Sequence, residues 1–433
     1  MTKRMLLAVL LLIVFALPAG CQKQGGEPTQ PTAPAPTILP TPTPEPAPTP
    51  TPDRVGEALA GMTVEQKAAQ LLVAGIEGTE PGEDAVQAIQ GYQVGGVILF
   101  GRNVESAEQL AALTNGLKEL NGDYTPLFLC VDQEGGRVDR MPPEASRTPS
   151  AWSVGQTLDT EGVGVSYGEL LAAECAAFGF NMDFAPSLDI WSNPDNTVIG
   201  DRAFGNDWEW TAFFGMSAVE GMEKQGTVIP VVKHFPGHGD TAVDSHYGLP
   251  VVDKSLEELE ELELRPFRQA IDTTCVYGTY GGDTSIPAIM VAHILLSQID
   301  PDNPASLSPE VVTGLLREEM GYEGVVCTDD LTMGAISNTY GMGEAAVLAV
   351  EAGCDLLLVC HGADNLAEAH AALVEAVDSG RIPEERLDES VYRVLSLKAV
   401  YGLSNAPVEA PDIEALNDRI AALERSIEAD TSQ

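Results

Sequence analysis

The chain has 433 residues and carries 65 Asp and Glu against 23 Lys and Arg, a formal net charge of -42. Proteins that bind nucleic acid hold its phosphates with clustered Lys and Arg, so this composition argues against nucleic acid as a partner. Hydrophobic residues make up 44% and charged residues 20% of the chain, which excludes wholesale disorder and leaves ample material for a core. The acidity by itself names no substrate.

The N-terminus is predicted to be an export signal. Two basic residues precede an apolar run over 5–17, which is shorter than the roughly 20 residues that span a bilayer. Small residues then precede Cys21, and this arrangement resembles a bacterial lipoprotein signal, in which the Cys becomes the lipid-bearing first residue. Pro18 stands where such signals most often have Leu, so an ordinary cleaved signal or an uncleaved anchor is the alternative. We expect 1–20 to be a signal peptide and Cys21 to anchor the protein to a membrane, facing outside the cytoplasm.

Residues 21–52 are predicted to be a linker that follows the lipidated Cys. Pro accounts for 11 of the 31 residues from 22 to 52, mixed mainly with Thr and Ala. Such a composition favours extended polyproline geometry and buries little apolar surface. We therefore expect a semi-rigid spacer between the membrane and the folded domain.

Seven cysteines at irregular spacings in so long a chain predict no disulfide framework. Four of them fall in apolar runs, where a Cys is usually a small buried hydrophobe. These four are Cys130, Cys327, Cys354 and Cys360.

The segment 53–403 is predicted to be a single α/β domain, a (β/α)8 TIM barrel. Short runs rich in Val, Ile, Leu and Phe alternate with helical patterns, as in parallel strands joined by crossover helices. The first helix is expected to begin with a capping box formed by Thr63 and Gln66. The expected strands are 71–75, 95–100, 127–133, 182–188, 228–235, 288–293, 324–329 and 355–360.

A C-terminal acidic amphipathic helix is predicted within 404–433. Apolar residues recur there at steps of three and four, which gives a narrow seam. The seam consists of Ile413, Leu416, Ile420, Leu423 and Ile427. We expect it to dock on the chain's own domain, with self-association as the alternative.

The ends of the predicted strands carry polar side chains. Active sites of (β/α)8 barrels are built at the C-terminal ends of the strands, so these residues predict a functional rim. They are Asp132, Gln133, Glu134, Asp183, Asp189, Lys233, His234, His293, Asp329 and Asp330.

The segment 233–246 holds three of the six histidines. One interpretation is a metal site, in which His234, His238 and His246 join Asp240 or Asp244. The other is an acid/base dyad, in which Asp244 orients His246 and raises its basicity. Glycines and a proline interrupt any helix that would set the spacing of metal ligands.

Asp329 lies at the end of an expected strand. A carboxylate held on a rigid strand end is suited to attack an anomeric carbon and form a covalent intermediate. The alternative is a structural Asp that caps the next helix, and Asp330 is the better candidate for that task.

Four segments together resemble the β-N-acetylglucosaminidases of glycoside hydrolase family 3, bacterial enzymes that trim N-acetylglucosamine (GlcNAc) from peptidoglycan fragments. The resemblance covers residues from about 63 to 403. The segments are 131–138, 199–204, 233–250 and 328–331.

The resemblance implies roles for individual residues. Asp329 matches the nucleophile, and His246 matches the general acid/base with Asp244 as its partner. The residues that match the sugar-holding positions of the minus-one subsite are Asp132, Arg140, Arg202, Lys233 and His234.

The resulting hypothesis is a cofactor-free, metal-free retaining exo-β-N-acetylglucosaminidase that acts on a GlcNAc-containing glycan or muropeptide. The alternatives are a phosphorylase, in which phosphate replaces water, and a non-catalytic sugar-binding lipoprotein. Trp191 is the preferred sugar-stacking platform among the tryptophans. Segment 273–285 is an expected insertion, and no second α/β sandwich domain is expected after the barrel.

Overall fold

The computed structural model describes residues 53–432 except 160–161, 242–243, 246–247 and 273–285. The signal, the linker with Cys21, His246 and the 273–285 insertion therefore lie outside the described residues. Residues Asp53–Gln433 form one unit by their contacts.

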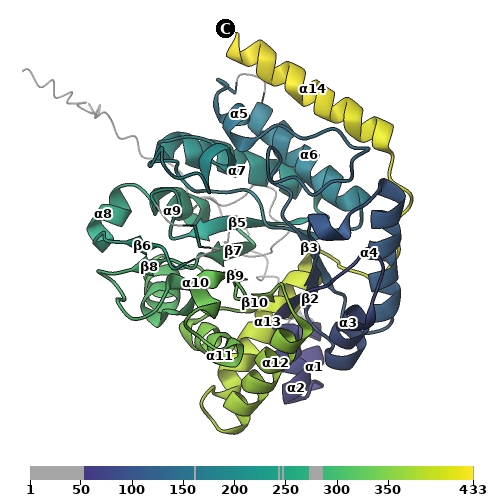
Figure 1. Ribbon diagram of the computed structural model, residues 1–433, viewed down its shortest axis with the longest axis vertical. Coiled ribbons are helices and arrows are strands. Elements are labelled where there is room, and N and C mark those ends of the chain that lie inside the picture. The colour runs from purple at the N-terminus through teal and green to yellow at the C-terminus, as the bar shows by residue number, and fades with distance from the viewer. Residues whose placement is uncertain (1–52, 160–161, 242–243, 246–247, 273–285, 433) are drawn as a thin grey trace, which may run out of the picture. The chain divides into compact units, whose positions relative to one another are not determined.

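Eight parallel strands close into a barrel, which confirms the expected fold (Figure 1). The order around the barrel is β1-β10-β9-β7-β5-β4-β3-β2. The strands are β1 (Leu72–Gly75), β2 (Gly96–Ile98), β3 (Phe128–Val131), β4 (Met182–Asp183), β5 (Ile229–Phe235), β7 (Ala288–Val291), β9 (Val325–Asp330) and β10 (Leu356–Val359).

The strands are buried on both faces, as parallel strands under a layer of helices must be. In β3, Phe128 and Cys130 join the cluster inside the barrel, whereas Leu129 and Val131 join the cluster between strands and helices. This alternation follows from the period of two along a strand. The five described cysteines are all buried, so the burial predicted for four of them is confirmed.

Helices surround the barrel and connect its strands (Figure 1). The capping box predicted at Thr63 and Gln66 is present at the start of α2. The helical elements are α1 (Arg54–Ala60), α2 (Val64–Gln70), α3 (Glu83–Val86), η1 (Gln87–Tyr92), η2 (Gly101–Asn103), α4 (Ala107–Asn121), α5 (Ala151–Gly155), α6 (Val163–Ala177), η3 (Gly200–Arg202), α7 (Trp208–Gln225), α8 (Leu256–Glu261), α9 (Arg265–Asp272), η4 (Ala305–Leu307), η5 (Glu310–Glu319), α10 (Gly334–Ser337), α11 (Met342–Ala352), α12 (Ala363–Asp378), α13 (Glu384–Val400) and α14 (Ile413–Thr431).

The C-terminal helix α14 docks on the chain's own domain. It lies along α6 in Figure 1, where it is coloured yellow. Ile420 and Leu423 share an apolar cluster with Tyr167 and Leu170 of α6. The expected seam therefore packs against the barrel's helical layer.

The N-terminal ends of the strands are closed by the last turn of α13. Lys398 donates hydrogen bonds to Oε1 of Gln70 at 2.9 Å and to the carbonyl of Gly95 at 2.8 Å, and its Nζ lies 4.8 Å from the ring centroid of Phe128. Burial lowers the pKa of Lys398 to about 7. Side chains thus fill the N-terminal end of the barrel. The opposite end is where an open site can form.

Strand β4 is shorter than the predicted 182–188. Pro186 has no N–H to donate, so the regular ladder cannot continue through it. The chain nevertheless stays beside β5, because Val231 N–H donates to the carbonyl of Ala185 at 3.1 Å and Lys233 N–H donates to that of Pro186 at 3.2 Å. A separate two-stranded sheet, β6 (Val251–Val252) with β8 (Leu295–Leu296), was not predicted because each strand has only two residues.

Among the described residues, no helix combines the length and the apolar character needed to cross a membrane.

Candidate active site

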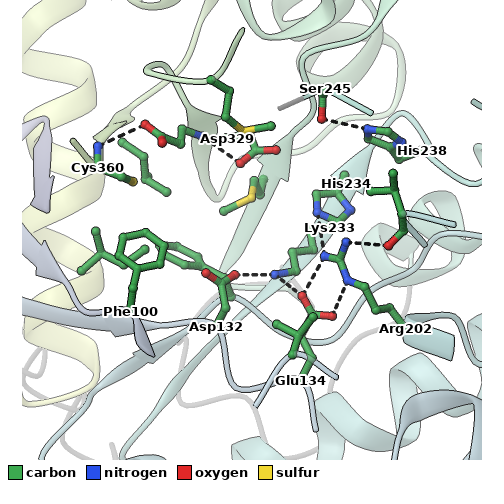
Figure 2. Close-up of a pocket in the computed structure, with 18 of the residues that line it drawn as sticks. Phe100, Asp132, Glu134, Arg202, Lys233, His234, His238, Ser245, Asp329 and Cys360 are labelled. Atoms are coloured by element: carbon green, nitrogen blue, oxygen red, sulfur yellow. Dashed lines mark hydrogen bonds and ion pairs between the residues drawn. The ribbon is translucent and has the colours of Figure 1, made fainter. Parts of the chain in front are cut away.

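A pocket of about 210 Å³ opens at the C-terminal ends of the barrel strands (Figure 2). It is lined by side chains from β2, β5, β7, β9 and β10 and from the loops that follow β2, β3, β4, β5, β9 and β10. Six of the residues to which the family resemblance gives a role line it together: Asp132, Arg140, Arg202, Lys233, His234 and Asp329. Glu134 and Asp330 of the predicted rim line it as well.

A buried lysine and a partly buried arginine meet two carboxylates at one side of this pocket (Figure 2). Nζ of Lys233 lies 2.6 Å from Oδ1 of Asp132 and 2.6 Å from Oε1 of Glu134. Arg202 donates two parallel hydrogen bonds to Glu134, at 2.7 and 2.8 Å. Such a planar pair holds both side chains in one geometry. We call these four residues, Asp132, Glu134, Arg202 and Lys233, the charge cluster.

The charges of this cluster sum to zero, which is what permits their burial. Burial alone would raise the pKa of Glu134, but Arg202 and Lys233 outweigh it and hold that pKa well below its usual range. Burial opposes the charge of Lys233 as well, and the two carboxylates nevertheless raise its pKa. All four side chains are therefore suited to charge-assisted hydrogen bonds with sugar hydroxyls.

His234 is oriented by a carboxylate that no sequence motif singled out for a role. Its Nδ1 lies 2.5 Å from Oδ2 of the fully buried Asp189. Its Nε2 lies 3.3 Å from Nη2 of Arg202. Because an arginine only donates, Nε2 is the acceptor and Nδ1 carries the proton toward Asp189. The pKa of Asp189 stays below its usual range because His234 outweighs the effect of burial.

Asp329 ends β9 on another side of the pocket (Figure 2). One of its oxygens accepts the backbone N–H of Asp330 at 2.8 Å. Burial favours the neutral acid, but the nearby His293, His234 and Lys233 outweigh it and lower the pKa of Asp329. The carboxylate is therefore ionised at neutral pH, as a nucleophile requires.

His293 and Asp330 hold the end of β9 in place. His293 Nε2 donates to the carbonyl of Asp330 at 2.9 Å, and its Nδ1 accepts from the hydroxyl of Ser306 at 2.7 Å. Asp330 Oδ1 accepts backbone N–H groups of Thr332 and Cys360. The prediction that Asp330 caps the next helix was wrong: α10 begins after Met333, and Asp330 instead fixes the turn before it and ties β9 to the end of β10.

Arg140 reaches the pocket from a loop after β3. Its backbone N–H donates to Oε1 of Gln133 at 2.8 Å, and the amide of Gln133 donates to Glu174 at 2.9 Å. Burial raises the pKa of Glu174 to about 8. The side-chain Nε of Arg140 is buried and has no hydrogen-bond partner among the described residues.

The predicted dyad is described only in part. Asp244 is described but is not among the residues that line the pocket. His246 lies outside the described residues. The neighbouring Ser245 and His238 do line the pocket, so the segment that carries Asp244 borders the site.

The predicted sugar platform, Trp191, packs against another tryptophan. Its ring packs edge-on against Trp152 with centroids 5.2 Å apart, and its N–H donates to the carbonyl of Asn196 at 3.1 Å. It is not among the pocket-lining residues, which instead include Phe100 and His361. Their rings stack with centroids 5.7 Å apart.

The metal interpretation finds no ligand set in the described part of the chain. Both ring nitrogens of His238 contact hydroxyls, those of Thr241 and Ser245. Within the described ranges, no three His, Cys, Asp or Glu side chains are grouped as metal ligands would be.

Comparisons with known proteins agree with this geometry. The glycosyl hydrolase family 3 N-terminal domain matches residues 63–397. The chain belongs to glycoside hydrolase family 3. The described pocket is therefore the candidate active site of a glycoside hydrolase.

Curated relatives of this family 3 chain are β-hexosaminidases. β-Hexosaminidase A of Pseudoalteromonas piscicida is 34% identical over 333 residues, which are 74% of this chain and 56% of that protein. The chain thus spans little more than half of that relative. The β-hexosaminidase of Nitrosomonas eutropha is 34% identical over 332 residues, which are 75% of this chain and 91% of that protein.

A solved structure extends the likeness. The family 3 β-N-acetylglucosaminidase from Paenibacillus sp. str. FPU-7 is 42% identical, with a TM-score of 0.77. The match covers 84% of this chain and 68% of that one.

Replacing Glu134 by Gln is expected to lower the free energy of unfolding by about 3 kcal/mol, because Lys233 is then left with Asp132 alone and Arg202 loses its carboxylate partner. Urea unfolding measures the loss. The matched control is Glu344→Gln, whose pair with Arg381 is exposed and contributes less than about 1 kcal/mol. Equal, small losses in both variants would show that the charge cluster is not the tightly coupled unit described here.

Proposed function

We propose that the protein is a retaining exo-β-N-acetylglucosaminidase that hydrolyses terminal GlcNAc from peptidoglycan-derived or related glycosides. The observation that carries the proposal is the pocket itself, in which the ionised Asp329 shares one small cavity with the charge cluster and His234. The curated β-hexosaminidases and the family 3 β-N-acetylglucosaminidase structure support the choice of sugar.

The size of the pocket supports action on a chain end. Pockets for drug-sized ligands enclose roughly 300–1,000 Å³, and this one encloses about 210 Å³. A cavity of this size suits one sugar ring better than several. Asp132 and Glu134 accept hydrogen bonds from sugar hydroxyls, while Lys233, Arg202 and Arg140 donate to sugar oxygens.

The proposed reaction has two steps, as in other retaining glycosidases. Asp329 attacks C1 while the bond from C1 to the glycosidic oxygen breaks, and protonated His246 gives its proton to that oxygen. Water then attacks C1 and displaces Asp329, and neutral His246 takes the proton from this water. Asp244 orients His246, and no cofactor takes part in either step.

Two alternatives are separated by one product analysis. A phosphorylase would release GlcNAc 1-phosphate when phosphate is present, whereas the proposed hydrolase releases free GlcNAc with or without it. A sugar-binding protein without activity would release neither product. The assay uses an aryl N-acetyl-β-D-glucosaminide and the wild-type chain.

Asp329→Ala is expected to lower kcat/KM by about 10⁴-fold or more on every substrate, because no covalent intermediate can form. Steady-state kinetics on an aryl glycoside and on a GlcNAc disaccharide measure the loss. The matched control is Asp364→Ala on α12, whose side chain is exposed and outside the pocket and whose activity should equal that of the wild type. Substantial turnover by Asp329→Ala would exclude Asp329 as the nucleophile.

His246→Ala is expected to reduce kcat/KM on a GlcNAc disaccharide about 10²–10⁴-fold, the usual contribution of a general acid. An aryl glycoside with a strongly acidic phenol needs little protonation, so its kcat/KM should change far less. If both substrates lost activity equally, His246 would not be the acid.

We also propose that the protein is exported and lipid-anchored through Cys21. Cys21→Ala should then move most of the protein from the membrane fraction to the soluble fraction, because the lipid attachment site is gone. Immunoblots of fractionated cells measure the distribution, with Cys275→Ala as the control that stays with the membranes. Retention of Cys21→Ala in the membrane fraction would favour an uncleaved anchor.

A further inference from the structure

His238 connects two parts of the segment that follows β5. Its side chain is buried, and both ring nitrogens are engaged. Nδ1 lies 2.7 Å from the hydroxyl of Thr241. Nε2 lies 3.2 Å from the hydroxyl of Ser245 (Figure 2). These two hydroxyls flank Asp244 along the chain, and His246 directly follows Ser245.

The backbone of His238 is firmly held. Its N–H donates to Oδ1 of Asp189 at 2.6 Å, and its carbonyl accepts from Nδ2 of Asn196 at 2.8 Å. The next residue, Gly239, lies so close to Ile190 that a Cβ there would come within 1.7 Å of the Ile190 carbonyl oxygen. The imidazole of His238 is therefore attached to a backbone that is held in place.

Ser245, the far partner, is also buried. Its carbonyl accepts the N–H of Ala335 at 3.0 Å, which joins this segment to the turn after β9. The hydroxyl of Ser245 and the ring of His238 thus link the ends of β5 and β9. Asp329 lies on β9, so this link connects the segment proposed to carry the acid with the strand that carries the proposed nucleophile.

His238 itself is not suited to deliver a proton. Burial, aided by the neighbouring His234, lowers the pKa of His238 to about 4. At neutral pH its ring is neutral and presents one donor and one acceptor. That state matches two hydroxyl partners, each of which both donates and accepts.

We propose that His238 is a positioning residue that sets the place of the acid/base segment relative to Asp329, through its contacts to Thr241 and Ser245. The inference rests on the proposed function, in which this segment supplies the proton to the leaving group. A small misplacement of the acid slows only the steps that need the proton. The attack by Asp329 on a substrate with a good leaving group is spared.

Two substitutions separate the contacts of the ring. The amide of Asn lies near the position of Nδ1 and can keep the contact to Thr241, whereas the amide of Gln reaches the position of Nε2 and can keep the contact to Ser245. His238→Asn is expected to lower kcat/KM on a GlcNAc disaccharide about 10–100-fold and on an aryl glycoside with an acidic phenol less than about 3-fold. His238→Gln should restore most of the kcat/KM that His238→Asn loses, because its amide keeps the contact to Ser245, and this contact sets the position of the acid/base segment.

Ser245→Ala removes the same link from its other end and serves as a second, milder variant. Its losses should show the same dependence on the leaving group, and the double variant with His238→Asn should lose little more than either single one. His370→Asn on α12, outside the pocket, is the matched control and should behave as the wild type.

The outcomes are distinct. No turnover by the wild-type chain on either substrate would refute the proposed function itself. Turnover by the wild type with equal losses on both substrates in His238→Asn and Ser245→Ala, or with fully additive losses, would overturn the positioning role. The expected leaving-group dependence with rescue by Gln supports it.

Discussion

The compensation of the buried Lys233 and the partly buried Arg202 by two carboxylates is the constraint on which this site depends. Lys233 is only 2% exposed, so its charge is tolerable only because Asp132 and Glu134 lie within 2.6 Å. These carboxylates follow β3, and the ammonium group comes from β5. The charge cluster therefore forms only when the folded barrel brings the C-terminal ends of β3 and β5 close together. Arg202, from the loop after β4, completes the arrangement.

Asp189 connects the charge cluster with the segment that is proposed to carry the acid. One of its oxygens orients His234 beside the charge cluster, and the other accepts the N–H of His238. A single buried carboxylate thus fixes both His234, which is proposed to hold the sugar, and the start of the segment that leads to Asp244. We interpret the site as two halves, one that holds the sugar and one that delivers the proton, with a common anchor.

The strands and the polar rim were predictable because they depend on local patterns. Apolar runs with helical stretches between them specify parallel strands, and the capping box at Thr63 involves residues three apart. The six pocket residues were identified by their motifs and strand ends. The extent of β4 was overestimated, although Pro186 is visible in the sequence and proline interrupts a regular ladder.

Partners distant in the sequence were harder to predict. Glu134 and Arg202 are 68 residues apart, and Asp189 and His234 are 45 apart, so no spacing rule pairs them. The contact of Trp191 with Trp152 was hard to predict for the same reason, because it depends on how the loop after β4 packs against α5. Phe100, Phe184 and His361 are among the aromatic residues that line the pocket. Phe100 and His361 are 261 residues apart in the sequence and meet because β2 and β10 both flank β1.

The covalent, retaining reaction is the central claim, and the configuration of the first product tests it most directly. Proton NMR of an aryl N-acetyl-β-D-glucosaminide during hydrolysis resolves the anomers of GlcNAc before they equilibrate. Two displacements at C1 predict that the β anomer is released first and that the α anomer grows only by later mutarotation. Initial release of the α anomer would contradict the account, because it would require a single displacement by water and leave Asp329 without its proposed role.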